Sequence, residues 1–278
     1  NLFIFYLPKS IFLKPTKSYI YLKYILLIMQ ISFFEEFPTK ENLDKLNLIN
    51  FKTKLYLAAR SLEEFKKIKT KIKNKNISQI IYWPILEKKE GYWISPFSQR
   101  KALIRIFEEL KQTKESIMLD LELPTTQNLF LYLTQSFNFF RNRELISNFI
   151  KNKPNIYTVE YYPEGRIKEK LQAKLGLHFD PKEYKNKVIK MLYHSLHNFD
   201  RNFIIKELKL GKEEFGDNYL IALGTIATGI HGNEKILSCS QLQQDLQIAQ
   251  EQKIKEVIIF RLGGLNKEYL DVIKKSMS

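Results

Sequence analysis

The sequence predicts an α/β protein, a single (β/α)8 TIM barrel preceded by an N-terminal extension outside the barrel. From Met29 onward, eight short apolar runs rich in β-branched and aromatic residues alternate with amphipathic stretches of helical period. This alternation favours parallel pairing through right-handed crossovers. Eight such units in a chain of 278 residues favour a closed barrel, with an open doubly wound sheet as the main alternative.

The expected strands are apolar runs that end in polar or aromatic residues. They span residues 30–37, 54–60, 77–85, 117–123, 156–162, 188–196, 219–227 and 256–262. No stretch between them has the composition of a linker, so we expect one barrel domain over residues 29–278 and a separate segment over residues 1–28.

Helix-capping patterns separate several of these strands. Ser61 and Glu64 have the spacing of a capping box. Ser98, Ser240 and Asn266 each precede an amphipathic stretch, and we expect them to cap three further helices.

The composition is that of a globular protein, with 44% hydrophobic and 27% charged residues. The formal net charge is +15, but the lysines are scattered among Ile, Asn, Phe and Tyr along the whole chain. No phosphate-binding loop of the P-loop type, zinc-finger spacing or RNA-binding aromatic block is present, so there is no specific nucleic-acid signal. The single cysteine, Cys239, rules out an internal disulfide.

Residues 1–28 differ from the rest of the chain. They are rich in Phe, Tyr, Ile and Leu and are interrupted by Pro8, Pro15 and four lysines. The longest uncharged run, residues 24–34, has 11 residues, too few to span a bilayer. We expect translation to start at Met29, which would give a cytoplasmic protein. A membrane anchor or an exported form is the alternative.

The stretch IMLDLELP carries two acids within an apolar run, Asp120 and Glu122. Side chains at i and i+2 on a strand lie on the same face, so both carboxyl groups should lie together. Two neighbouring carboxyl groups in a partly dry site repel, and at least one pKa should rise. A carboxylic acid that holds its proton near neutral pH suits general acid catalysis.

Other polar and aromatic residues also fall at the carboxyl ends of the expected strands, where barrels place their active sites. From this position we expect substrate to be bound by Trp83, Glu160, Tyr162, His194, His231 and Arg261. Glu35, Glu36, Tyr193, His197 and Glu234 lie at the same ends. A structural interpretation stands beside this one, in which Glu35, Arg60 and Arg261 form an ion-pair ring at the barrel mouth.

Three of these strand ends resemble family 18 glycoside hydrolases, the chitinase-like barrels. The fourth strand of that family ends in D-x-E-x-P, matched by the run from Asp120 to Pro124. The sixth carries M-x-Y-D, and this chain has Met191, Leu192, Tyr193 and His194. The seventh runs into a glycine, as IALGTIATG does here.

The resemblance implies a retaining hydrolase of amino-sugar glycosides without a cofactor. Glu122 would be the general acid, and Asp120 would orient the acetamide group of the substrate, whose oxygen attacks the anomeric carbon. Tyr193 would steady that acetamide, and Trp83 would stack on a sugar. The chain departs from the family pattern at Met118, where the family has an Asp, and at two other positions, Glu115 and His194.

Two alternatives remain open at this point. A metal-dependent barrel enzyme, such as a sugar isomerase or hydrolase, would use Glu122, Glu160, His194 and His231 as ligands for a divalent metal such as Zn²⁺ or Mn²⁺. A non-catalytic carbohydrate-binding or scaffold barrel is favoured if Arg60 and Arg261 neutralise the acids. The partner expected is a small-molecule or oligosaccharide substrate, and the oligomeric state is not specified by the sequence.

Overall fold

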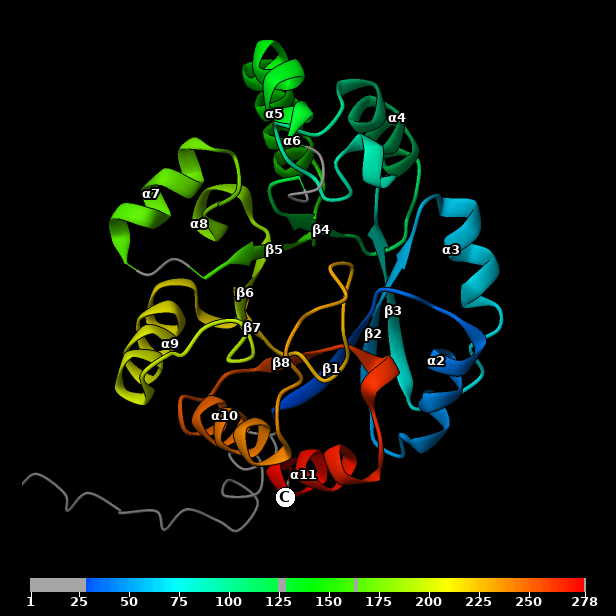
Figure 1. The fold of residues 1–278 in the computed structure, drawn as a ribbon, viewed down its shortest axis with the longest axis vertical. Coiled ribbons are helices and arrows are strands. Elements are labelled where there is room, and N and C mark those ends of the chain that lie inside the picture. The colour runs from blue at the N-terminus through cyan, green and yellow to red at the C-terminus, as the bar shows by residue number, and fades with distance from the viewer. Residues whose placement is uncertain (1–28, 125–128, 163–164, 278) are drawn as a thin grey trace, which may run out of the picture.

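Eight parallel strands form the centre of the molecule (Figure 1). The computed structural model describes residues 29–124, 129–162 and 165–277. The strands are β1 (Gln30–Glu35), β2 (Thr53–Ala59), β3 (Ile77–Pro84), β4 (Met118–Leu121), β5 (Tyr157–Tyr161), β6 (Lys187–Leu192), β7 (Tyr219–Gly224) and β8 (Glu256–Phe260).

The strands follow one another around a ring in the order β3-β2-β1-β8-β7-β6-β5-β4. Strand β1 pairs with both β2 and β8, so the first strand of the barrel lies beside the last. The ring is completed between β3 and β4 by a parallel bridge of Tyr82 with Ile117, where the Tyr82 N–H donates to the Ser116 carbonyl at 2.8 Å. The predicted (β/α)8 barrel is confirmed.

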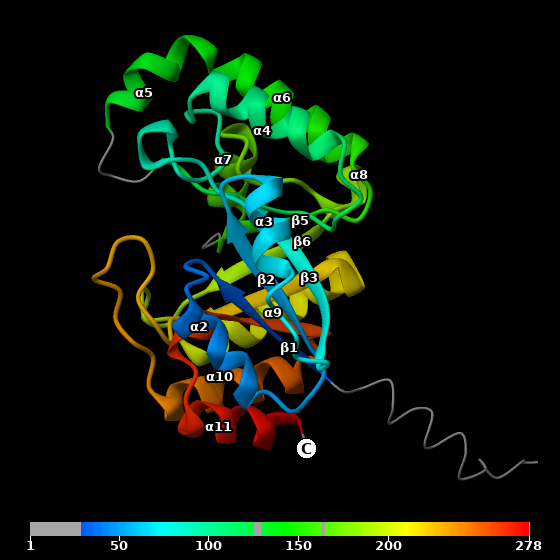
Figure 2. The same ribbon diagram turned by 90° about the vertical axis from the view of Figure 1, so that its right-hand side faces the viewer.

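Helices surround this ring and follow every strand (Figures 1 and 2). They are α2 (Lys40–Asp44), α3 (Leu62–Lys69), α4 (Arg100–Lys111), α5 (Phe130–Gln135), α6 (Phe139–Asn152), α7 (Arg166–Lys174), α8 (Pro181–Tyr184), α9 (Arg201–Phe215), α10 (Cys239–Glu251) and α11 (Lys267–Met277). In Figure 2, helices α4, α5 and α6 lie together at one side of the barrel.

Two of the predicted helix caps are confirmed. The Ser61 hydroxyl accepts the Glu64 N–H at 3.1 Å and begins α3. The Asn266 side chain accepts the Tyr269 N–H at 3.0 Å at the start of α11. Each cap satisfies a backbone donor that has no partner within its helix.

Two other cap predictions were wrong by one or two residues. Helix α4 begins at Arg100, and the Ser98 hydroxyl instead donates to the Trp93 carbonyl at 2.7 Å within the preceding loop. Helix α10 is capped by Ser238 and not by Ser240. Closely spaced serines offer alternative caps, and the loop conformation decides between them.

The barrel separates two hydrophobic layers. Phe34, Trp83, Met118 and Val159 belong to a cluster inside the ring. Alternate residues of the same strands belong to a larger layer between the strands and the helices, among them Phe33, Leu119 and Leu121. Because strand side chains alternate between faces, Asp120 lies on the inner face of β4 with Met118. The inner face therefore carries the acids.

The predicted N-terminal extension, residues 1–28, lies outside the described residues. Within the described ranges, no helix combines the length and apolar character needed to cross a bilayer.

Candidate active site

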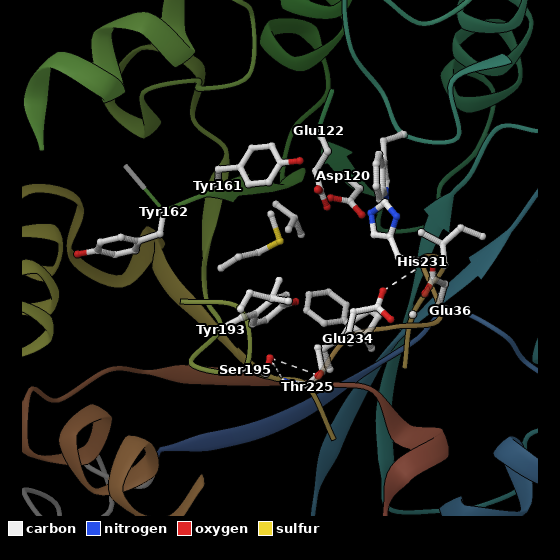
Figure 3. Close-up of a pocket in the computed structure, with 18 of the residues that line it drawn as sticks. Glu36, Asp120, Glu122, Tyr161, Tyr162, Tyr193, Ser195, Thr225, His231 and Glu234 are labelled. Carbon is white, nitrogen blue, oxygen red and sulfur yellow. Dashed lines mark hydrogen bonds between the residues drawn. The ribbon is translucent and has the colours of Figure 1, made fainter. Parts of the chain in front are cut away.

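A cavity of about 450 Å³ opens at the carboxyl ends of the strands (Figure 3). Its walls combine acids with aromatic rings. These residues come from strands β1, β3, β4, β5 and β8, from the positions directly after β1, β4 and β5, and from the loops that follow β3, β6 and β7. The lining residues include Glu36, Trp83, Trp93, Asp120, Glu122, Tyr161, Tyr162, Tyr193, His231, Glu234 and Phe260.

Asp120 and Glu122 lie side by side in this cavity, as predicted from their spacing (Figure 3). Asp120 is 4% exposed, and its Oδ1 is buried without a hydrogen-bond partner. Burial raises the pKa of Asp120 well above its usual value, and the neighbouring Glu122 raises it further. Burial also raises the pKa of Glu122, against the hydrogen bonds from Tyr161 and Asp120. The pair therefore retains a proton near neutral pH.

Two tyrosines face this acid pair. The Tyr161 hydroxyl points toward Glu122 (Figure 3) and hydrogen-bonds to it. Tyr193 is 8% exposed, and burial together with the charges of Asp120 and Glu122 raises the pKa of its hydroxyl. Both phenols therefore stay neutral and can donate hydrogen bonds.

Glu36 is a third acid of the cavity, placed on its inner wall just after β1. It is 3% exposed, and the Tyr92 hydroxyl donates to its Oε1 at 2.6 Å. Its Oε2 is buried without a partner. Burial raises the pKa of Glu36 to about 7, although the hydrogen bond from Tyr92 opposes this shift.

A loop after β7 contributes His231 and Glu234. The Leu237 N–H donates to the Thr225 carbonyl at 2.7 Å, and the Thr225 hydroxyl donates to the Lys235 carbonyl at 2.6 Å. These two bonds hold the base of the loop closed. The His231 N–H donates to Glu234 Oε1 at 3.2 Å, so the loop fixes Glu234 toward the cavity (Figure 3).

Aromatic side chains line the remaining walls. Trp83 is 2% exposed and packs edge-on against Phe34 with ring centroids 5.6 Å apart. Its indole Nε1 is buried without a partner. The ring of Trp93 packs against the His231 ring, with the ring centroids 5.6 Å apart. Tyr162, predicted as a substrate-binding residue, also lines the cavity.

Glu160 does not reach the cavity, although the sequence analysis placed it there. It lies on the outer face of β5, where His178 Nδ1 and Lys190 Nζ contact its Oε2 at 2.6 and 2.9 Å. Burial would raise the pKa of Glu160, but Lys190 and His178 lower it to about 2. Val159 and Tyr161 occupy the inner face instead.

His194 also lies outside the cavity. Its Nδ1 is 2.9 Å from Asp245 Oδ2, on helix α10. Burial lowers the pKa of His194, but the hydrogen bond and charge of Asp245 raise it above its usual value. The alternative metal set of Glu122, Glu160, His194 and His231 is therefore not brought together. Among the described residues, no three His, Cys, Asp or Glu side chains are placed to hold a metal ion.

Arg261 belongs to a structural network at the barrel mouth. Its NH1 atom lies 3.1 Å from Glu35 Oε1, and its Nε donates to the Thr228 carbonyl at 2.8 Å. The Gly263 N–H donates to Glu35 Oε2 at 2.7 Å. Of the three residues in the ion-pair ring considered from sequence, Glu35 and Arg261 contact each other, whereas Arg60 is exposed. Within the described residues, no arginine forms an ion pair with the cavity acids.

Sequence comparison gives no relative, since neither a protein-family model nor a curated protein matches the chain. Solved structures do match in fold. The PgaB (BpsB) glycoside hydrolase domain from Bordetella bronchiseptica superposes with a TM-score of 0.50 over 90% of this chain and 97% of that chain, at 10% identity. The chain shares its fold with glycoside hydrolase barrels. The spore cortex-lytic enzyme SleL from Bacillus megaterium QM B1551 gives 0.51 over 90% and 74%, at 9% identity.

Proposed function

We propose that this barrel hydrolyses glycosides of N-acetylated amino sugars, with Glu122 as the general acid. The observation that carries the proposal is the pair of carboxyl groups, buried Asp120 and half-buried Glu122, in a cavity lined by aromatic rings. Sugars present apolar ring faces and many hydroxyl groups, so a site of aromatic walls and acids suits them. The glycoside hydrolase domain and the cortex-lytic enzyme that share the fold are consistent with it.

In the proposed reaction, the proton of Glu122 moves to the glycosidic oxygen while the bond from that oxygen to the anomeric carbon breaks. The electron pair of the bond leaves with the oxygen. The acetamide oxygen of the substrate attacks the anomeric carbon and forms a cyclic intermediate, so no protein nucleophile is needed. Glu122, now a carboxylate, takes a proton from the water that opens this intermediate. The product keeps the configuration of the substrate.

Asp120 and Tyr193 are the residues proposed to position the acetamide. Asp120 Oδ1 has no partner among the described residues and can accept the acetamide N–H. The neutral Tyr193 hydroxyl can donate to the acetamide oxygen. Met118 stands where the family 18 pattern has an Asp, and this difference fits the proposed arrangement. The Met118 side chain is fully buried and apolar, so it offers Asp120 no competing hydrogen bond.

The proposal is tested by hydrolysis of N-acetylglucosamine oligomers with the full chain and matched variants. Glu122→Gln keeps the side-chain shape and removes the proton, so turnover should fall by about 10²- to 10⁴-fold. Glu63→Gln is the control, because Glu63 is exposed on α3. Turnover by the Glu122→Gln variant at the rate of the control would exclude Glu122 as the acid.

A further inference from the structure

The cavity contains a second pair of acids that the proposed reaction does not use, Glu36 and Glu234. The Oε2 atoms of both side chains are buried without a hydrogen-bond partner. A Cβ built on Gly229 would lie 3.0 Å from Glu36 Oε2 and 3.1 Å from Glu234 Oε1. Both carboxyl groups therefore border the same small space, which exists because residue 229 has no side chain.

Among the described residues, neither of these two acids forms an ion pair with a lysine or an arginine. Glu36 Oε1 is held by the neutral hydroxyl of Tyr92, and Glu234 Oε1 by a backbone N–H. Arg261 lowers the pKa of Glu36 through its charge, but its own N–H groups bond to Glu35 and to a backbone carbonyl. Asp120 and Glu122 add further acid groups to the same cavity. Lys235 also lines the cavity, but its side chain is exposed, and the described residues place no positively charged hydrogen-bond donor on Glu36 or Glu234. The two acids therefore still require such a donor.

A primary ammonium group meets this requirement. Its three N–H donors can bond to carboxylate oxygens in any arrangement, and its charge relieves the repulsion among the acids. A neutral hydroxyl group would leave that repulsion in place. Trp83 adds a further unsatisfied group, a buried indole N–H that can donate to a sugar oxygen.

We propose that Glu36 and Glu234 bind the free ammonium group of an amino sugar that neighbours the N-acetylated ring undergoing hydrolysis. The substrate class is then a partly de-N-acetylated amino-sugar oligosaccharide. This inference rests on the proposed function and specifies which oligosaccharides it acts on.

The test compares kcat/KM for tetramers of N-acetylglucosamine with kcat/KM for the same tetramers after partial de-N-acetylation. The full chain should prefer the amine-containing tetramers by about tenfold or more, mainly through KM, because only the ammonium group can form charge-assisted hydrogen bonds with the two acids. Glu36→Gln and Glu234→Gln should bring this ratio toward one, whereas Glu63→Gln should keep it. Gly229→Ala, which keeps both charges but fills the space between them, should also lower the ratio.

The outcomes separate this inference from the proposed function. Hydrolysis without any preference for the amine would overturn the inference and leave the glycosidase assignment intact. If the full chain hydrolyses neither the fully N-acetylated nor the partly de-N-acetylated tetramers, the glycosidase assignment fails. Calorimetric titration of the Glu122→Gln variant with both sets of tetramers then decides the inference. Tighter binding of the amine-containing tetramers that is lost in the Glu36→Gln, Glu122→Gln double variant supports it. Equal or absent binding overturns it.

Discussion

Replacing Glu36 with Gln measures how strongly this cavity disfavours a charged acid. Gln keeps an oxygen that can accept the Tyr92 hydroxyl, which lies 2.6 Å from Glu36 Oε1, and it removes only the ionisable group. Glu36 is 3% exposed, so solvent screens its charge little. Burial raises its pKa from 4.5 to about 7.

The sign of the effect follows from the two pKa values. The unfolded chain releases the Glu36 proton near pH 4.5, whereas the folded chain holds it to about pH 7. The folded state therefore binds more protons between these values, and the free energy of unfolding falls as the pH rises through this window. At about 1.4 kcal/mol per pKa unit, the full loss is about 3 kcal/mol. The Gln variant does not suffer this loss.

Urea unfolding at pH 4.5, 6 and 8 provides the assay, with the midpoint and slope fitted at each pH. We predict that the free energy of unfolding of the Glu36→Gln variant equals that of the original protein at pH 4.5. At pH 8 it should be higher than that of the original protein by about 3 kcal/mol. Glu63→Gln, on the exposed face of α3, should show no such difference. A Glu36→Gln variant no more stable than the original at pH 8 would refute the reasoning.

Three further predictions follow from the described contacts. The rate of hydrolysis should fall as the pH rises above neutrality, because the Asp120–Glu122 pair must keep a proton, and an initial-rate profile that stays flat to alkaline pH would contradict this. Tyr161→Phe removes a hydrogen bond that lowers the pKa of Glu122, so the descending limb of that profile should move to higher pH, and an unmoved limb would exclude the contact. Glu160→Gln should lower the free energy of unfolding by about 3–5 kcal/mol, because it leaves Lys190 as a buried cation without its carboxylate. This loss should shrink as the pH falls from 4.5 toward 2, where Glu160 itself takes up a proton, and urea unfolding that shows no loss at pH 7 would contradict it.

The sequence was sufficient to predict the barrel and the acid pair, because both depend on local periodicity. Alternation of strands and helices is visible along the chain, and the two-residue period of a strand places Asp120 and Glu122 on one face. The same rule could have identified Tyr161. In β5, Val159 and Tyr161 alternate with the polar Thr158 and Glu160, which indicates that the aromatic residue faces inward.

The positions of Glu160 and His194 depend on residues distant in sequence. The partners that make the outer face of β5 favourable for Glu160 are Lys190 and His178, which a periodicity argument cannot supply. His194 follows the end of β6, where the strand rule no longer applies, and its position is set by Asp245 on α10. The proposed role of Glu36 was not predicted for a similar reason, because Glu234, which borders the same space beside Gly229, comes from a distant part of the sequence.

The most direct test of the central claim is the rate of hydrolysis of aryl glycosides of N-acetylglucosamine whose acetyl group carries an increasing number of fluorine atoms. Fluorine withdraws electrons from the acetamide oxygen, the proposed nucleophile held by Asp120 and Tyr193. The account predicts that turnover by the full chain falls steeply from the acetyl to the trifluoroacetyl substrate. Turnover that is independent of fluorine would contradict an attack by the acetamide, and the absence of turnover on the acetyl substrate would contradict the glycosidase assignment itself.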